Sequence, residues 1–143
     1  MPMMLKPQEL QEKALSFLAK ERLMVLGTSL HDKVWSATVH FVETSEFEMI
    51  FFSNPSARHC QNILKNPHVS AVVTNEKTAT SIQFAGTCRI ADGIEWDKYF
   101  EIYSQKVKNA AQRVDQVIYV IKPDEVWMID EKLTGGRSRT QIL

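Results

Sequence analysis

The run FFSNPSARH at residues 51–59 concentrates the side chains of this chain that could bind an anion. It contains two hydroxyl groups and two basic groups, from Ser53, Ser56, Arg58 and His59. The guanidinium of Arg58 can donate two parallel hydrogen bonds to one phosphate, and a serine hydroxyl can donate another. His59 adds a further donor, and a bound phosphate dianion would raise its pKa and favour its charged form. The run is therefore a candidate phosphate site.

A helix start would gather these groups around one point. Asn54 is a favoured N-cap and Pro55 is favoured at the first helical position, so we expect a helix from there to about Lys65, ended by Asn66-Pro67. Backbone N–H groups at a helix start lack partners within the helix and attract phosphate. The side chains that we expect this helix to bury are Ala57, Cys60 and Leu64, with Ile63 alongside. An ordinary capped helix whose basic side chains face water fits this segment equally well.

Other reactive side chains give weaker signals. Cys60 directly follows His59, but neighbouring side chains of a helix diverge, so a cysteine–histidine nucleophile is not expected. Cys60 and Cys88 form neither a disulfide framework nor a zinc motif. No carboxylate pair is suited to acid–base chemistry, and no P-loop or H-E-x-x-H run occurs. Arg137 and Arg139 could reach an anionic ligand, but a frayed basic tail is the simpler interpretation. We assign no catalytic residue and no metal site.

The elements around the candidate site are predicted to be short strands and two further helices. Apolar residues at i, i+4, i+7 and i+8 predict a helix over 7–21. Another helix opens at Asp92, with Glu95 placed as in a capping box, and carries aromatic residues at helical spacing as far as Ala110. The predicted strands are 23–30, 34–42, 47–53, 69–74, 80–91, 116–122 and 125–130.

The order of these elements indicates the fold class. Short polar connections between the first three strands suit antiparallel hairpins, and the pattern lacks strand–helix–strand alternation. Gly86, inside a predicted strand, suggests a bulge, a bend or a close backbone approach. Six or seven strands with about three helices therefore predict one mostly antiparallel β-barrel domain of the α+β class over residues 1–143.

Composition excludes several classes of function. The chain has 143 residues, with 17 basic residues against 17 acidic ones and 44% apolar residues. A neutral total argues against a nucleic-acid footprint, because such surfaces carry excess positive charge. No apolar run approaches the roughly 20 residues that a membrane-spanning helix needs, and the first residues lack the pattern of a signal peptide. We expect a cytoplasmic protein that binds neither nucleic acid nor membrane.

Two longer runs resemble a known family. The run FFSNPSARHCQNILKNPHVSAVV, followed by SIQFAGTCRIADG, is similar in order and spacing to the pyridoxamine 5'-phosphate oxidase-like FMN-binding split-barrel family. The resemblance covers residues 15–130 and is strongest to short members whose substrate is not established. It implies an antiparallel Greek-key split β-barrel.

The resemblance assigns phosphate contacts by position. Arg58 matches the family arginine that grips the FMN phosphate, and His59 replaces the usual lysine. Ser53 matches a Thr or Ser at the strand end, and Phe52 takes a place often held by Tyr. The usual serine before the arginine is Ala57 here. Ser56, one residue earlier, is its candidate replacement.

The resemblance also assigns positions around the isoalloxazine ring. The ring would lie along the predicted strand at Ala37, Thr38, Val39 and His40, held largely by backbone groups. A glutamine from the partner subunit reaches the cofactor in this family. Ser81 has the equivalent spacing, and Gln83 has the same strand parity and the matching side chain.

These assignments imply a homodimeric flavoprotein with FMN at the interface between subunits. The implied activity is an FMN-dependent oxidoreductase that acts on an unknown small molecule or electron donor. The C-terminal substrate segment of the oxidase itself is not present, so pyridoxamine phosphate oxidation is not expected. The alternative is a split-barrel module that binds flavin or a tetrapyrrole without turnover. A barrel that binds single-stranded nucleic acid is disfavoured by the neutral charge.

Overall fold

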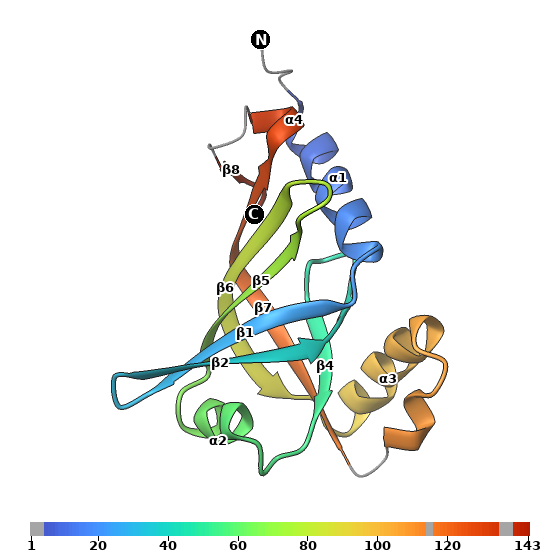
Figure 1. Ribbon diagram of the computed structural model, residues 1–143. Helices are drawn as coiled ribbons and strands as arrows, with labels where there is room; N and C mark the ends of the chain where they lie inside the picture. Colours follow the sequence, from blue (N-terminus) through green and yellow to red (C-terminus); the bar gives the residue numbers. More distant parts are fainter. Residues whose placement is uncertain (1–4, 114–115, 135–138) are drawn as a thin grey trace.

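The computed structural model describes residues 5–113, 116–134 and 139–143. Its elements, drawn in Figure 1, are α1 (Pro7–Ala19), β1 (Leu23–Leu30), β2 (Lys33–His40), β3 (Val42–Glu43), β4 (Met49–Ser53), α2 (Arg58–Lys65), β5 (His68–Asn75), β6 (Thr80–Ile90), α3 (Ile94–Lys106), the 3-10 helix η1 (Ala110–Arg113), β7 (Val117–Asp130), α4 (Glu131–Thr134) and β8 (Thr140–Gln141).

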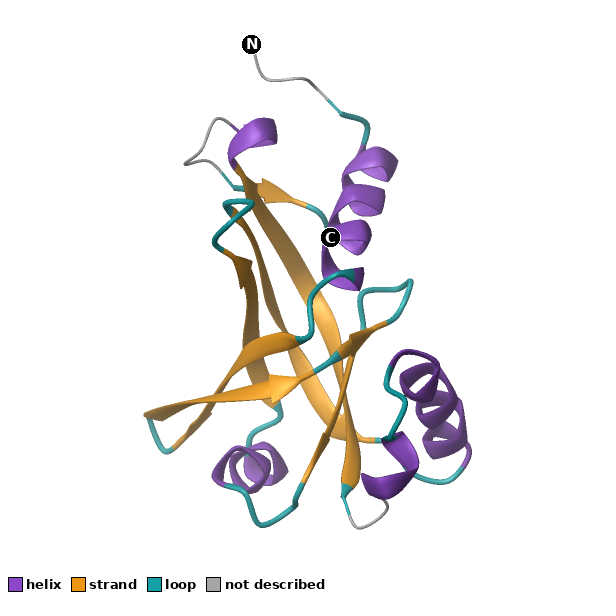
Figure 2. Cartoon of the chain, turned by 45° about the vertical axis from the view of Figure 1, so that its right-hand side comes forward, coloured by secondary structure: helices purple, strands orange, loops and turns teal. Residues whose placement is uncertain are grey.

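The strands form one curled antiparallel sheet with the order β2-β1-β5-β6-β7-β4-β3, and β8 pairs with β7. The sheet wraps into an open half-barrel, and α2 lies below the β1–β2 hairpin (Figures 1 and 2). This is the predicted α+β class with a mostly antiparallel split barrel. Two sequence neighbours, β1 and β2, form the hairpin that borders the candidate site.

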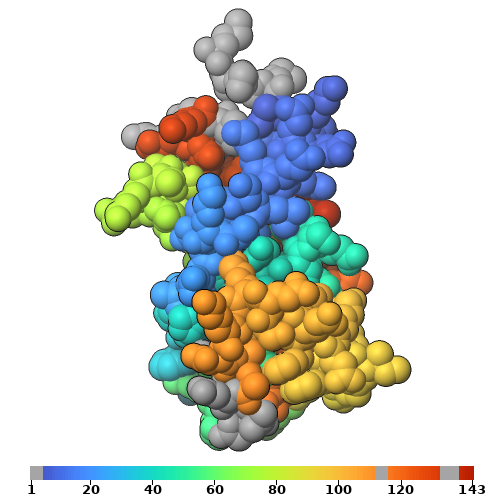
Figure 3. Space-filling view, turned by 90° about the vertical axis from the view of Figure 1, so that its right-hand side faces the viewer, coloured from blue at the N-terminus to red at the C-terminus, as the bar shows by residue number. Residues whose placement is uncertain are grey.

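Two apolar cores hold the helices against the sheet. The first fills the barrel and includes Leu18 of α1, Phe51 of β4 and Tyr119 of β7. The second lies between the sheet and α3, where Tyr99 and Tyr103 are buried. The aromatic repeat of the predicted third helix therefore serves packing. Figure 3 shows α1 over the upper part of this side of the molecule and α3 over the lower part.

Gly86 lies at an irregularity between β6 and β7, as predicted. The register shifts between Ala85 and Gly86, and a Cβ atom at Gly86 would collide with the carbonyl oxygen of Lys122. The two strands predicted over 116–122 and 125–130 are in fact one strand, β7, because this bulge accommodates Pro123 within it. Pro123 therefore does not end the strand and lies only at a local irregularity in the pairing of β6 with β7.

The first and third helices differ from prediction at one or both ends. The first helix ends at Ala19 rather than at residue 21. The third begins at Ile94, with Gly93 at φ 57° as its N-cap and no side-chain cap from Asp92. Its Glu95 side chain accepts hydrogen bonds from Arg89 instead, so the predicted capping box is wrong. This helix ends at Lys106, and Ala110 belongs to η1.

In the described part of the chain, no helix is long and apolar enough to cross a membrane.

Candidate functional site

A tight turn, not a helix, follows β4. The side-chain oxygen of Asn54 accepts hydrogen bonds from the backbone N (2.9 Å) and the Oγ (2.8 Å) of Ser56, and the backbone N of Ala57 donates to the Asn54 carbonyl (2.9 Å). Helix α2 therefore begins at Arg58, and the predicted start at Asn54 and Pro55 is wrong because Asn54 uses its side chain to close an Asx-turn. This shift places Arg58 and His59 in the first turn of α2.

His59 contacts Ser53 across this turn. Their Nε2 and Oγ atoms are 2.7 Å apart. Ser53 is buried at the end of β4, and burial lowers the pKa of His59. A neutral His59 can accept from the Ser53 hydroxyl, whereas a charged His59 donates to it and leaves the hydroxyl hydrogen for another acceptor. The pair can therefore switch the direction of its hydrogen bond when an anion arrives.

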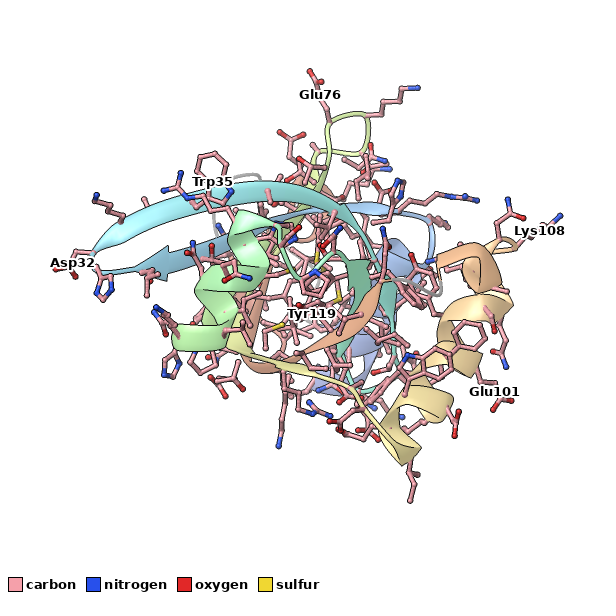
Figure 4. All side chains as sticks on the ribbon, turned by 90° about the horizontal axis from the view of Figure 1, so that it is seen from below. Asp32, Trp35, Glu76, Glu101, Lys108 and Tyr119 are labelled. Atoms are coloured by element: carbon pink, nitrogen blue, oxygen red, sulfur yellow. The ribbon has the colours of Figure 1, made fainter. Side chains whose placement is uncertain are left out.

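Arg58 is exposed and stacks on an indole ring. Its guanidinium carbon lies 4.1 Å from the centroid of the Trp35 ring on β2. Figure 4 shows Trp35 on the strand that passes over α2. Among the described residues, no side chain or carbonyl accepts a hydrogen bond from Arg58. Its N–H groups are thus free to bind an anionic ligand.

Three buried side chains hold α2 against the sheet. Cys60, Asn62 and Ile63 are buried. Leu64, which was expected to be buried, is 62% exposed, because the face of α2 that packs on the barrel contains Asn62 instead. The predicted end of the helix at Lys65 is confirmed.

The predicted ring positions lie on β2, the last strand of the sheet on this side. Val39 is buried and Ala37 is half-buried, whereas Thr38 and His40 are exposed. Only β1 pairs with β2 in the described chain, so the backbone groups on the other edge of β2 have no strand partner. An edge of this kind offers backbone donors and acceptors to a planar ligand.

The other predicted cofactor contacts are dispersed. Phe52 packs into the second core, with its ring centroid 4.7 Å from that of Tyr103, so a ligand at α2 can meet only its backbone. Ser81 shares a hydrogen bond of 3.0 Å with Thr74 on the outer face of the sheet. Gln83 is exposed on the same face. Neither Ser81 nor Gln83 has a described hydrogen bond to the Arg58 region of its own chain.

The thiols and the tail add no second site. Cys60 and Cys88 are buried inside the barrel, and burial raises the pKa of Cys88 to about 12. Burial and a raised pKa disfavour the thiolate of Cys88, which is the reactive form of a thiol. Arg139 places its guanidinium carbon 4.9 Å from the Trp127 ring centroid, and Arg137 lies outside the described residues. Within the described ranges, no group of three His, Cys, Asp or Glu side chains could hold a metal ion.

Trp35 is the site residue that sequence reasoning missed. It lies 23 positions before Arg58 in the chain, and only the pairing of α2 with the hairpin brings the two together. A tryptophan within a predicted strand was the only available signal. Its placement depends on tertiary structure that the local pattern does not contain.

The fold defines a split-barrel protein, and the junction of β4 with α2 places its candidate anion-binding groups beside an edge of β2 that no described strand pairs with. Residues 10–130 match the pyridoxamine 5'-phosphate oxidase family. The chain therefore belongs to this family, as its resemblance implied. A search of curated proteins finds no sequence match.

Solved structures with the same fold include two proteins whose names indicate haem as a ligand. A haem-binding protein from Mycobacterium smegmatis has a TM-score of 0.76 and 16% identity, over 97% of this chain and 59% of that one. General Stress Protein 26 from Bacillus anthracis has a TM-score of 0.69 and 21% identity, over 85% and 94% of the two chains. The haem storage protein HutZ from Vibrio cholerae has a TM-score of 0.67 and 18% identity, over 84% and 94%. At these identities the likeness establishes the fold alone.

Proposed function

We propose that this protein binds FMN, with the phosphate at the start of α2. The observation that carries the proposal is the arrangement of Arg58: its guanidinium face is occupied by Trp35, and its N–H edge has no acceptor among the described residues. The Ser53–His59 pair lies at the same turn, and the Ser53 hydroxyl supplies a further donor when His59 is charged. A phosphate dianion would satisfy all three groups at once.

In this proposal each residue has a defined role. Arg58 donates two parallel hydrogen bonds to phosphate oxygens. His59, charged in the presence of the dianion, donates one hydrogen bond to Ser53, and the Ser53 hydroxyl then donates to the phosphate. Ser56 has already committed its hydroxyl hydrogen to Asn54 and contributes less. The free edge of β2 at Ala37–His40 would orient the ring through backbone groups.

The chemistry that FMN supplies when bound is hydride or electron exchange, so we propose an oxidoreductase that acts on a small molecule or electron donor. The protein would contribute orientation and would exclude water on one face of the ring. No described side chain near Arg58 is suited to act as an acid or base other than His59. We also propose a cytoplasmic location, which suits the two buried free thiols.

A homodimer is part of the proposal. The outer face of the sheet contains a hollow of about 410 Å³, lined by small and apolar residues such as Val25 and Val72 together with Gln83, Glu125, Trp127 and Arg139. Val25 is 41% exposed there, although its apolar side chain would be stabilised by burial. A second copy could cover this face. Ser81 and Gln83, which point outward from it, would then be available to the cofactor of the other subunit.

A second candidate is a module that binds haem or another tetrapyrrole without turnover. The observation that favours it is the fold shared with the two haem proteins named above. An iron ligand would be needed, and His40 is an exposed imidazole on the same edge strand. In this alternative the edge of β2 is used but Arg58 is not required for the ring.

The two candidates are separated by titrating the purified protein with FMN, riboflavin and haemin and recording visible absorption and affinity. We expect FMN to bind, and riboflavin, which lacks the phosphate, to bind much more weakly. Haemin binding that depends on His40, together with no preference for FMN over riboflavin, would support the second candidate and overturn the first. Bound FMN that no nicotinamide donor reduces would remove the oxidoreductase part alone.

A further inference from the structure

We propose that Trp35 is a positioning residue for the phosphate site: it holds the guanidinium of Arg58 by its face and leaves the N–H edge available for a phosphate. This inference rests on the proposed function. It concerns a residue outside the set that the sequence resemblance assigns to cofactor binding.

The first observation is a stripe along α2. Arg58, Asn62 and Asn66 follow one another at intervals of four, so they lie on one face of the helix and its C-cap. The buried Asn62 donates from Nδ2 to Thr28 Oγ1 at 3.0 Å. Asn66 donates from Nδ2 to the carbonyl oxygen (3.1 Å) and the Oγ (3.0 Å) of Ser29.

The second observation is which part of the β1–β2 hairpin this stripe contacts. Thr28 and Trp35 are directly opposite each other in the β1–β2 register, and Ser29 is opposite Val34. The residues of this stripe thus contact two adjacent residue pairs of the β1–β2 hairpin. The contact between Arg58 and Trp35 is the first of this series of contacts, because Arg58 is the first residue of α2. Arg58 is therefore placed by the same hairpin that seats the rest of the helix.

The geometry of the contact explains why it would assist binding. A guanidinium stacks on an aromatic ring through its planar face, and it donates hydrogen bonds through its edge in the same plane. The Trp35 contact therefore competes with no phosphate oxygen. It also restricts a long side chain that would otherwise lose conformational entropy on binding. A partly exposed ring suffices for this role, and Trp35 is 41% exposed.

Trp35 also connects the two halves of the proposed site. It lies on β2 two residues before Ala37, the first of the proposed ring positions. A shift of the hairpin would move the ring edge and Arg58 together. Trp35 thereby fixes the distance between the phosphate group and the strand edge, which a flexible arginine alone could not do.

The experiment compares FMN with riboflavin in Trp35→Ala, Trp35→Phe and Arg58→Ala, singly and combined. We expect Trp35→Ala to weaken FMN binding about two- to fivefold, since an exposed cation–π contact is of this size. Riboflavin affinity should not change, and Trp35→Phe should retain part of the effect. In the Arg58→Ala background, Trp35→Ala should add nothing. The matched control is Trp96→Ala, because Trp96 stacks on Phe100 and no cation.

Equal losses for FMN and riboflavin, or additive losses in the double variant, would overturn the positioning role while leaving the proposed function intact. Wild-type protein that fails to bind FMN would instead overturn the proposed function. A second probe keeps the two distinct: inorganic phosphate added to Trp96→Phe/Trp127→Phe protein, whose remaining tryptophan fluorescence comes from Trp35. We expect a change in emission that Arg58→Ala abolishes. An unchanged emission would count against Trp35 even if FMN binds.

Discussion

Arg58 and Arg89 are two arginines beside aromatic rings, and they differ in what their N–H groups do. Arg89 donates to both carboxylate oxygens of Glu95, at 3.3 and 2.6 Å, and to the hydroxyl of Tyr99 at 3.2 Å. Tyr99 in turn donates to Glu48 at 2.8 Å. Among the described residues, Arg58 has only the contact of its guanidinium with the Trp35 ring. The N–H groups of Arg89 are therefore used within the protein, whereas those of Arg58 are available to a ligand.

The difference shows how a cation can be assigned a role before any ligand is seen. The hydrogen bonds with Glu95 raise the pKa of Arg89, and the hydrogen bonds from Arg89 lower the pKa of Glu95. Each of these two charges therefore has a partner of opposite charge within the protein. Around Arg58 the described residues include no carboxylate partner, so its charge is balanced only by solvent until an anion binds. The Arg89 region therefore stabilises α3 against the sheet, and the Arg58 region is suited to binding.

Replacing Arg58 should have the largest effect on ligand affinity. We expect Arg58→Ala to weaken FMN binding by about 1.5–3 kcal/mol, roughly 10- to 150-fold, because a charged bidentate contact is lost. The free energy of unfolding should change little. Isothermal titration with FMN and denaturation in urea measure the two quantities on the same samples.

Two controls accompany this variant. Lys65→Ala removes a positive charge from the other end of α2, and Arg89→Ala removes the committed guanidinium. Neither should weaken FMN binding appreciably. An affinity that is unchanged in Arg58→Ala, or that falls equally in Lys65→Ala, would mean that Arg58 is not a specific phosphate ligand.

His59 should make FMN affinity depend on pH. Burial lowers its pKa in the free protein, whereas a phosphate dianion favours the charged imidazole. The complex thus binds more protons than the free protein, so affinity rises as pH falls. We expect a gain of about three- to tenfold between about pH 8 and about pH 6.5, where the phosphate remains largely dianionic.

The matched variants are His59→Lys, which stays charged over this range, and His59→Gln, which stays neutral. Both should abolish the pH dependence, with the lysine variant tight and the glutamine variant weak throughout. Affinity measured at five or six pH values would test this directly. A slope that persists in both variants would assign the titration to another group.

Replacing Arg89 should affect stability and not binding. Its side chain is 40% exposed, so we expect Arg89→Ala to lower the free energy of unfolding by about 1 kcal/mol or less. In the wild type the Arg89–Glu95 ion pair stabilises the fold fully at pH values above the ordinary pKa of a carboxyl group. This stabilisation is lost as the pH falls through the lowered pKa of Glu95. The difference between wild type and variant in urea denaturation should therefore shrink in acid. A difference that is constant with pH would argue against this ion pair as its source.

Most of the fold could be predicted because strands and amphipathic helices leave periodic patterns. The strand over 23–30 has the predicted bounds, and 80–90 differs by one residue. The errors occur where one residue has two possible partners. Asn54 could cap a helix but closes a turn, and Glu95 could return to its own helix start but pairs with Arg89. Local sequence does not decide between a near partner and one on another element.

The candidate site was only partly accessible to sequence reasoning. Arg58, His59 and Ser53 are close in the chain, so their proximity could be predicted, and the Ser53–His59 contact confirms that two of them meet. Trp35 could not be predicted, since its contact with Arg58 depends on the seating of α2 on the hairpin. The assignment of Ser81 and Gln83 to the cofactor depends on a second subunit and stays a prediction.

The smallest expected effect distinguishes the two serines of the site. Ser56 is exposed and its hydroxyl donates to Asn54 at 2.8 Å, whereas the hydroxyl of the buried Ser53 faces His59 at 2.7 Å. A phosphate dianion needs donors, and only Ser53 gains a free hydroxyl hydrogen when His59 becomes charged. We therefore expect Ser56→Ala to change FMN affinity by less than about 0.5 kcal/mol and Ser53→Ala to weaken it by about 1 kcal/mol. Parallel titrations of the two variants test this order. The reverse order would show that the phosphate lies over the turn at Asn54 rather than against the barrel end, and it would move the site away from His59.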